Sequence, residues 1–99
     1  MPKENYKLSN EAQRDLEQIW LYTHENWSIE QADRYLNLIF NEIEYLCQKS
    51  NSAMNFDSIR KGYWRSKVNS HFIFYKISFT NELEIIRILH ERMDIENQL

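Results

Sequence analysis

Two adjoining stretches of this sequence place their apolar side chains at the spacing of an α-helix. The first stripe consists of Ala12, Leu16, Ile19, Trp20, Thr23 and Trp27, and the second of Ala32, Tyr35, Leu36, Ile39, Phe40, Ile43, Leu46 and Cys47. Ser9 is placed to cap the first helix, while Ser28 and Gln31 form the capping-box pattern that opens the second. Two amphipathic helices joined by so short a connection predict an antiparallel hairpin.

The rest of the chain changes to the period of β-strands. Strands are predicted at residues 5–8, 63–68, 71–77 and 83–89. The last three would form an antiparallel meander, and residues 49–57, which follow neither period, would form a loop. Neither helix can bury its apolar stripe against the other alone, so the hairpin should pack on the sheet. The sequence therefore predicts one α+β domain spanning residues 1–99.

The pattern also predicts which side chains are buried. The strand at residues 71–77 is apolar on both faces, which is typical of a strand inside a sheet. In the last strand, the period of two puts Ile86 and Ile88 on one face and Ile85, Arg87 and Leu89 on the other. The large aromatic residues of the helical stripes are expected in the core, and these are Trp20, Trp27, Tyr35 and Phe40.

The residue counts exclude several kinds of site. The chain has one Gly, one Cys and three His. A single Gly cannot build a glycine-rich phosphate loop, and His24, His71 and His90 show no metal-ligand spacing, so no cofactor or metal is expected. Cys47 lies in a helical stripe and is expected to be a core residue. With no apolar leader or membrane-spanning stretch, we expect a cytoplasmic protein without membrane association.

The net charge of −3 hides a basic segment. Residues 60–92 hold seven Lys or Arg and three Asp or Glu, a local balance of +4. The cationic and aromatic side chains of this segment are Arg60, Lys61, Tyr63, Trp64, Arg65, Lys67, Tyr75, Lys76, Arg87, His90 and Arg92. Such a cluster fits a nucleic acid or an acidic protein segment, and it fits a solvated sheet face equally well.

A ribonuclease could in principle be built from this basic segment. RNA cleavage needs a proton carrier at the 2′-hydroxyl and positive charge around the phosphate. His90 or Tyr75 could carry the proton, while Arg65, Arg87 and Arg92 could supply the charge. Many sheets offer one His and several Arg without catalysing a reaction, so the residues alone leave an enzyme and a binding protein both open.

The sequence resembles a known family along nearly its whole length. Residues 6–27 read Y-K-L-S-x-x-A-x-x-D-L-x-x-I-W-x-Y-T-x-x-x-W, and the later motifs are Q-A-x-R-Y-L, I-R-x-G-Y, S-H-x-I-F-Y-K and I-I-R-I-L-H-x-R-M-D. This pattern resembles ParE-type toxins of the RelE/ParE superfamily, and the fold implied agrees with the elements predicted above. Asn69 stands where that family usually has Gly before Ser70 and His71, and Asn tolerates a positive φ there.

The resemblance implies the toxin of a type II toxin–antitoxin system. Such a toxin inhibits DNA gyrase, blocks replication and is neutralised by a ParD-type antitoxin, so its contact with nucleic acid would be indirect and it would not be an enzyme. Relatives of the RelE branch instead cut messenger RNA on the ribosome. Met93 follows Arg92 where that branch would place a further acid or base, which favours the gyrase branch, whereas His90 keeps the ribonuclease open.

The family pattern also suggests residues for each role. Target inhibition is expected from Arg65, Arg87, His90 and Arg92. Antitoxin contact is expected from Tyr22, Trp64 and Arg65, either in a groove beside the helices or by a strand added to a sheet edge. A ribonuclease would use His90, Arg87, Arg92, Arg65 and Tyr75. Ion pairs of Arg92 with Asp94 and of Arg87 with Glu84 are the structural alternatives.

Overall fold

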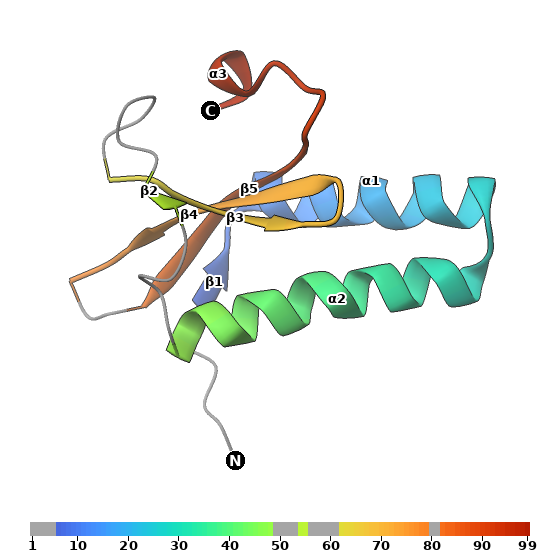
Figure 1. The fold of residues 1–99 in the computed structure, drawn as a ribbon, viewed down its shortest axis with the longest axis horizontal. Helices are drawn as coiled ribbons and strands as arrows, with labels where there is room; N and C mark the ends of the chain where they lie inside the picture. The colour runs from blue at the N-terminus through green and yellow to red at the C-terminus, as the bar shows by residue number, and fades with distance from the viewer. Residues whose placement is uncertain (1–5, 49–53, 56–61, 80–81) are drawn as a thin grey trace.

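The computed structural model describes residues 6–48, 54–55, 62–79 and 82–99, and its elements follow the α+β order predicted from the sequence (Figure 1). The elements are β1 (Tyr6–Leu8), α1 (Asn10–Asn26), α2 (Ile29–Gln48), β2 (Met54–Asn55), β3 (Trp64–Val68), β4 (His71–Ile77), β5 (Leu83–His90) and α3 (Ile95–Gln98). In the view of Figure 1, the strands lie between α2 and the short α3.

The two long helices begin where their predicted caps stand. Ser9 Oγ accepts a hydrogen bond from the Ala12 amide at 2.9 Å and donates one to the Ile86 carbonyl of β5 at 2.6 Å. The Gln31 amide donates to Ser28 Oγ at 3.0 Å at the start of α2. Side-chain oxygens at these positions satisfy amides that have no partner inside the helix. The cap of α1 therefore also fastens that helix to β5.

The described residues form one sheet with the strand order β1-β5-β4-β3-β2. The predicted meander of β3, β4 and β5 is confirmed, with antiparallel pairing throughout. Two shorter strands widen this sheet: β1 runs parallel to β5, and β2 pairs with the start of β3. Met54 and Asn55 thus form a strand inside the predicted loop 49–57, whose other residues lie outside the described part of the chain.

Helices α1 and α2 bury their stripes on one face of the sheet. The core contains Ala12, Leu16, Ile19, Ile39, Ile43, Leu46, Ile73, Tyr75, Leu83, Ile85 and Ile88, with the half-buried Cys47, Tyr35 and Phe40 packed against it. Trp20 is partly buried and donates from Nε1 to Asp33 Oδ1 of α2 at 2.9 Å. The prediction for Trp27 was wrong, because this residue follows the last turn of α1 and its side chain is 65% exposed.

A β-bulge changes the predicted faces of β5. Phe74 lies opposite Arg87 whereas its neighbour Tyr75 lies opposite Ile85, so one extra residue of β5 is inserted between these pairs. A bulge shifts the alternation of side chains by one position. Ile85 and Ile88 consequently share the core, and the prediction that paired Ile86 with Ile88 on one face was wrong.

The turn between β3 and β4 confirms what the sequence suggested for Asn69. This residue has a φ of +52°, in the left-handed region that Asn tolerates better than most side chains. The turn aligns His71 of β4 with His90 of β5 at the neighbouring end of the sheet. No helix in the described residues is both long and apolar enough to cross a membrane.

Candidate functional site

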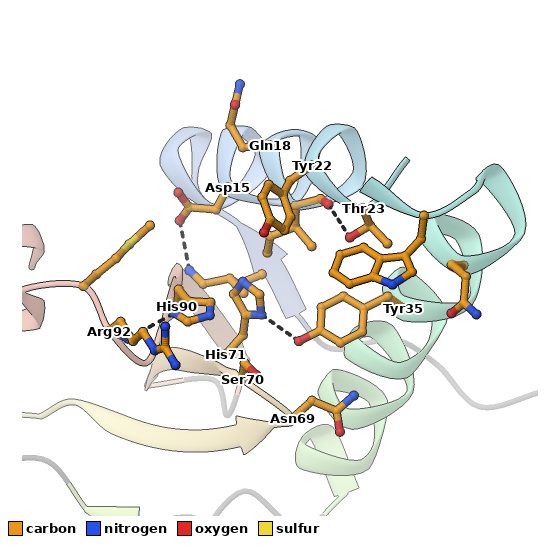
Figure 2. Close-up of a pocket in the computed structure, with 15 residues that line it drawn as sticks. Asp15, Gln18, Tyr22, Thr23, Tyr35, Asn69, Ser70, His71, His90 and Arg92 are labelled. Carbon is orange, nitrogen blue, oxygen red and sulfur yellow. Dashed lines mark hydrogen bonds between the residues drawn. The ribbon is translucent and has the colours of Figure 1, made fainter. Parts of the chain in front are cut away.

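A groove of about 810 Å³ lies where α1 and the start of α2 meet the ends of β4 and β5 (Figure 2). We call it the histidine groove. Its lining includes Asp15, Gln18, Ile19, Tyr22, Thr23, Trp27, Gln31, Tyr35, Asn69, Ser70, His71, Ile88, His90, Arg92 and Met93. A concave surface of this size with a few converging polar groups has the form of a binding site.

Tyr35 and His71 form the polar floor of the histidine groove. Tyr35 Oη lies 2.6 Å from His71 Nδ1, and the two share a hydrogen bond (Figure 2). The same hydroxyl donates to the Val68 carbonyl at 3.3 Å. Burial, with a smaller contribution from neighbouring His90, lowers the pKa of His71 from 6.5 to about 4. Burial also raises the pKa of Tyr35. Both groups are therefore neutral at pH 7.

His90 stands edge-on to His71 and holds the turn that follows β5. The two ring centroids are 5.1 Å apart with an interplanar angle of 86°. His90 Nδ1 accepts a hydrogen bond from the Arg92 amide at 3.1 Å, so in the neutral ring the proton lies on Nε2. The described residues place no third metal-ligating side chain with these two rings.

Further hydrogen bonds fix the same turn. The Glu91 amide donates to the Ser70 carbonyl at 2.8 Å, and the Met93 amide donates to the His90 carbonyl at 3.0 Å. Glu91 also forms an ion pair of 2.9 Å with Lys67 of β3. Arg92 and Met93 extend from this fixed backbone as exposed side chains. Among the described residues, no acidic side chain lies within 4 Å of the Arg92 guanidinium.

Asp15 and Arg87 form a bidentate ion pair beside the histidine groove. Arg87 Nε donates to Asp15 Oδ2 at 2.8 Å, and Arg87 Nη2 donates to Asp15 Oδ1 at 2.9 Å. Asp15 Oδ2 also accepts from the Ile88 amide at 2.9 Å, on the part of β5 that extends beyond β1. The hydrogen bond to Asp15 raises the pKa of Arg87. The negative charge in this wall of the groove is therefore neutralised within the fold.

The rim of the histidine groove is aromatic and exposed. Tyr22 is 61% exposed and Trp27 is 65% exposed, and their rings meet edge to face with centroids 6.1 Å apart. Met93, which also lines the groove, is 48% exposed. Exposed apolar side chains around one concavity are a mark of protein–protein contact sites.

The residues predicted for target inhibition are divided between two places. His90 and Arg92 line the histidine groove. Arg87 lies beside it, paired with Asp15 and not with Glu84. Arg65 lies elsewhere, with its guanidinium 4.3 Å from the centre of the Phe72 ring.

The three residues predicted for antitoxin contact also lie apart. Tyr22 is on the rim of the histidine groove. Trp64 is half-buried and packs against the core, on the sheet face that the helices cover. Side chains alternate along a strand, so the neighbouring Arg65 faces the other side of the sheet.

The five residues named for a ribonuclease do not share one site. Tyr75 is fully buried in the core, where burial and the nearby Glu42 raise its pKa to about 12. Arg65 is on the opposite sheet face, and Arg87 is bound to Asp15. Only His90 and Arg92 of this set line the histidine groove.

Sequence reasoning missed several residues of this groove. Asp15 and His71 appear in the family motifs without a role, and the helical stripes predict Tyr35 and Trp27 as core residues. The signal that could have found His71 was its predicted position beside the Asn69–Ser70 turn, next to the end of the last strand. Nothing local in the sequence shows that Asp15 reaches Arg87.

The lowered pKa of His71 predicts a pH dependence of stability. The unfolded chain takes up this proton near pH 6.5 and the folded chain only near pH 4, so stability is complete above pH 6.5 and falls as the pH drops toward 4. We expect His71→Gln to reduce the loss of unfolding free energy between pH 7 and pH 5 by on the order of 1 kcal/mol, after allowance for solvent screening. Urea unfolding at pH 7 and at pH 5 measures this loss of unfolding free energy. His24→Gln, at an exposed position, is the control. Equal pH dependence of stability in the intact protein, His71→Gln and His24→Gln would contradict the prediction.

Comparisons with known proteins agree on one family. The sequence profile described as "ParE toxin of type II toxin-antitoxin system, parDE" matches residues 6–95. The chain is 34% identical to Toxin ParE1 of Mycobacterium tuberculosis and also 34% identical to Toxin ParE1 of Caulobacter vibrioides, in each case over 95% of this chain and 96% of the relative. Toxin ParE of Escherichia coli is 27% identical over 95% of this chain and 91% of that protein.

A solved structure shares the fold. A chain from the structure titled "Chromosomal ParDE TA system from P. aeruginosa" superposes with a TM-score of 0.76, covering 91% of this chain and 98% of the other. The two sequences are 18% identical, so this likeness concerns the arrangement of the elements.

Proposed function

The chain belongs to the ParE toxin family of type II toxin–antitoxin systems, and we propose that it inhibits DNA gyrase, blocks replication and is neutralised by a ParD-type antitoxin. Gyrase works in the cytoplasm, so the toxin would act there. The observation that supports this proposal best is the exposed turn after β5. It presents Arg92 and Met93 from a backbone fixed by hydrogen bonds to His90 and Ser70.

An inhibitor that works by binding needs groups that the fold leaves available. Arg92 meets this requirement, because it is exposed and no acidic side chain of the described residues lies within 4 Å of it. Arginine is also among the residues that contribute most to binding at protein interfaces. His90 would contribute its Nε2–H as a donor next to Arg92. We therefore assign target contact to Arg92 and His90.

The arrangement supports an inhibitor over a ribonuclease. RNA cleavage would require an acid and a base placed on either side of one phosphate. Tyr75 is buried with a raised pKa, and Arg65 is on the far side of the sheet. Arg87 is paired with Asp15. The remaining two residues, His90 and Arg92, could bind a partner without completing that machinery.

The antitoxin would reach the same groove. Tyr22 and Trp27 offer aromatic surface on one rim, and the wall at Asp15 carries no free negative charge. An antitoxin segment seated there would cover His90 and Arg92 and so prevent target contact. Trp64 and Arg65 face opposite sides of β3, so an antitoxin that also touches them would have to pass around the sheet.

A supercoiling assay tests the proposal. Purified gyrase would act on relaxed plasmid with the protein titrated in, with and without its antitoxin. We expect loss of supercoiling, accumulation of cleaved DNA, and recovery of activity when the antitoxin is added in equal amount. Full supercoiling in the presence of saturating, folded protein would overturn the proposal, and messenger RNA cleavage on ribosomes would then be measured.

A further inference from the structure

Arg87 connects two parts of the fold. It binds Asp15 of α1, and it also holds residues 88–98, which we call the C-terminal loop. Besides its bidentate bond to Asp15, Arg87 Nη1 donates to the Gln98 carbonyl of α3 at 3.0 Å. Arg87 belongs to β5 and Gln98 to α3, so this bond ties α3 back to the strand that precedes it. The loop between the tied residues includes His90, Arg92 and Met93.

Asp15, the other partner of Arg87, is held in a rigid position. Asp15 is held in α1, and α1 is itself fastened to β5 by Ser9, whose amide donates to the Ile85 carbonyl at 2.9 Å and whose hydroxyl donates to the Ile86 carbonyl at 2.6 Å. Asp15 then accepts the Ile88 amide two residues further along β5. The Ile88 amide thus fixes the Asp15 carboxylate, whose two oxygens then hold the Arg87 guanidinium by a bidentate contact.

Arg87 is poorly placed to touch a target directly. Its side chain is 19% exposed and that of Asp15 is 14% exposed. Nε, Nη1 and Nη2 each donate to a protein acceptor at 2.8 to 3.0 Å. These bonds use three of the five guanidinium N–H donors, and the small exposed fraction of the side chain leaves little of it for contact with a target. The geometry of Arg87 therefore fits a residue that positions the C-terminal loop.

We propose that Asp15 and Arg87 are positioning residues that hold the C-terminal loop, so that His90 and Arg92 are presented to the target in one geometry. This inference rests on the proposed function for its effect on gyrase, while the tie itself can be tested without gyrase. Pre-ordering a binding segment reduces the entropy lost on association. Loosening the tie should therefore weaken inhibition without unfolding the protein.

Two deletions at the chain end separate the tie from general stability. Removing Gln98 and Leu99 takes away the carbonyl that accepts from Arg87, while the Asp15–Arg87 pair stays intact. Removing Leu99 alone leaves Gln98 in place with a terminal carboxylate, which accepts a hydrogen bond from Arg87 at least as well as the carbonyl does. The second variant is therefore the matched control for loss of the chain end.

Amide hydrogen exchange and supercoiling inhibition would be measured on both variants. In the two-residue deletion we expect exchange of the Arg92 and Met93 amides to be about tenfold faster. We expect its half-inhibitory concentration to be about fivefold higher, with an unchanged unfolding midpoint. Deletion of Leu99 should leave all three values as in the intact protein.

The two readouts distinguish the two proposals. If the intact protein does not inhibit gyrase, the proposed function fails, and the exchange rates alone still decide whether the tie orders the loop. Protected Arg92 and Met93 amides with full potency in the two-residue deletion would overturn the positioning role. Equal loosening in the Leu99 deletion would also overturn it, because the Gln98 acceptor is retained there.

Discussion

Replacing Arg87 with alanine is expected to lower the free energy of unfolding by about 3 to 5 kcal/mol. The substitution leaves the Asp15 carboxylate, which is 14% exposed, without its bidentate partner. An unpaired charge shielded from water is among the most destabilising defects in a folded protein. It also removes the hydrogen bond to Gln98 of α3. Urea or guanidinium unfolding, monitored by tryptophan fluorescence, gives the value directly.

Arg14→Ala is the matched control for this measurement. Arg14 precedes Asp15 on α1 and is exposed, so its removal should change the unfolding free energy by no more than about 0.5 kcal/mol. A similar small loss in Arg87→Ala would show that the ion pair contributes little to stability. Arg87→Lys adds a graded test, because a lysine keeps the charge but cannot reproduce the two-pronged contact with Asp15.

Replacing Arg92 with alanine is expected to weaken gyrase inhibition by about 30-fold or more, a change of roughly 2 kcal/mol or more in binding. Arg92 is exposed and holds the turn through its backbone amide, not its side chain. The unfolding free energy should therefore stay within about 0.5 kcal/mol of that of the intact protein. The half-inhibitory concentration in the supercoiling assay, measured on folded protein, tests this expectation.

Arg34→Ala is a suitable comparison for Arg92→Ala, because Arg34 is an exposed cation on α2 outside the histidine groove. It should inhibit gyrase as strongly as the intact protein. Undiminished inhibition by Arg92→Ala would remove the assignment of target contact to Arg92. A weakened Arg34→Ala would instead indicate a dependence on overall charge.

The helices and the meander could be predicted because each depends on signals close together in the sequence. Ser9 and Ser28 mark the helix starts, and both act as caps in the structure. Asn69 marked a tight turn and adopts the positive φ that such a turn requires. The prediction that Trp27 lies in the core was wrong because a helical stripe does not show where the helix ends. Trp27 lies one position past α1.

The features that could not be predicted from the sequence depend on contacts between residues far apart in the chain. The bulge in β5 arises from how that strand pairs with β4, and the residues of β5 alone do not predict it. Asp15 and Arg87 are 72 positions apart, and they meet only because α1 docks beside β5. His71 and His90 became neighbours through strand register, although the family motifs contain both. Such contacts require the assembled sheet.

The pairing of β1 with β5 has a consequence for how a cell makes this protein. Tyr6 lies opposite Leu83, so the first strand finds its partner only after most of the chain has been synthesised. Contacts between residues far apart in the sequence form late and slow the folding of a domain. Until β5 is available, the buried stripe of α1 lacks the sheet strand that it contacts most. The newly made chain therefore cannot complete its sheet until β5 has been synthesised.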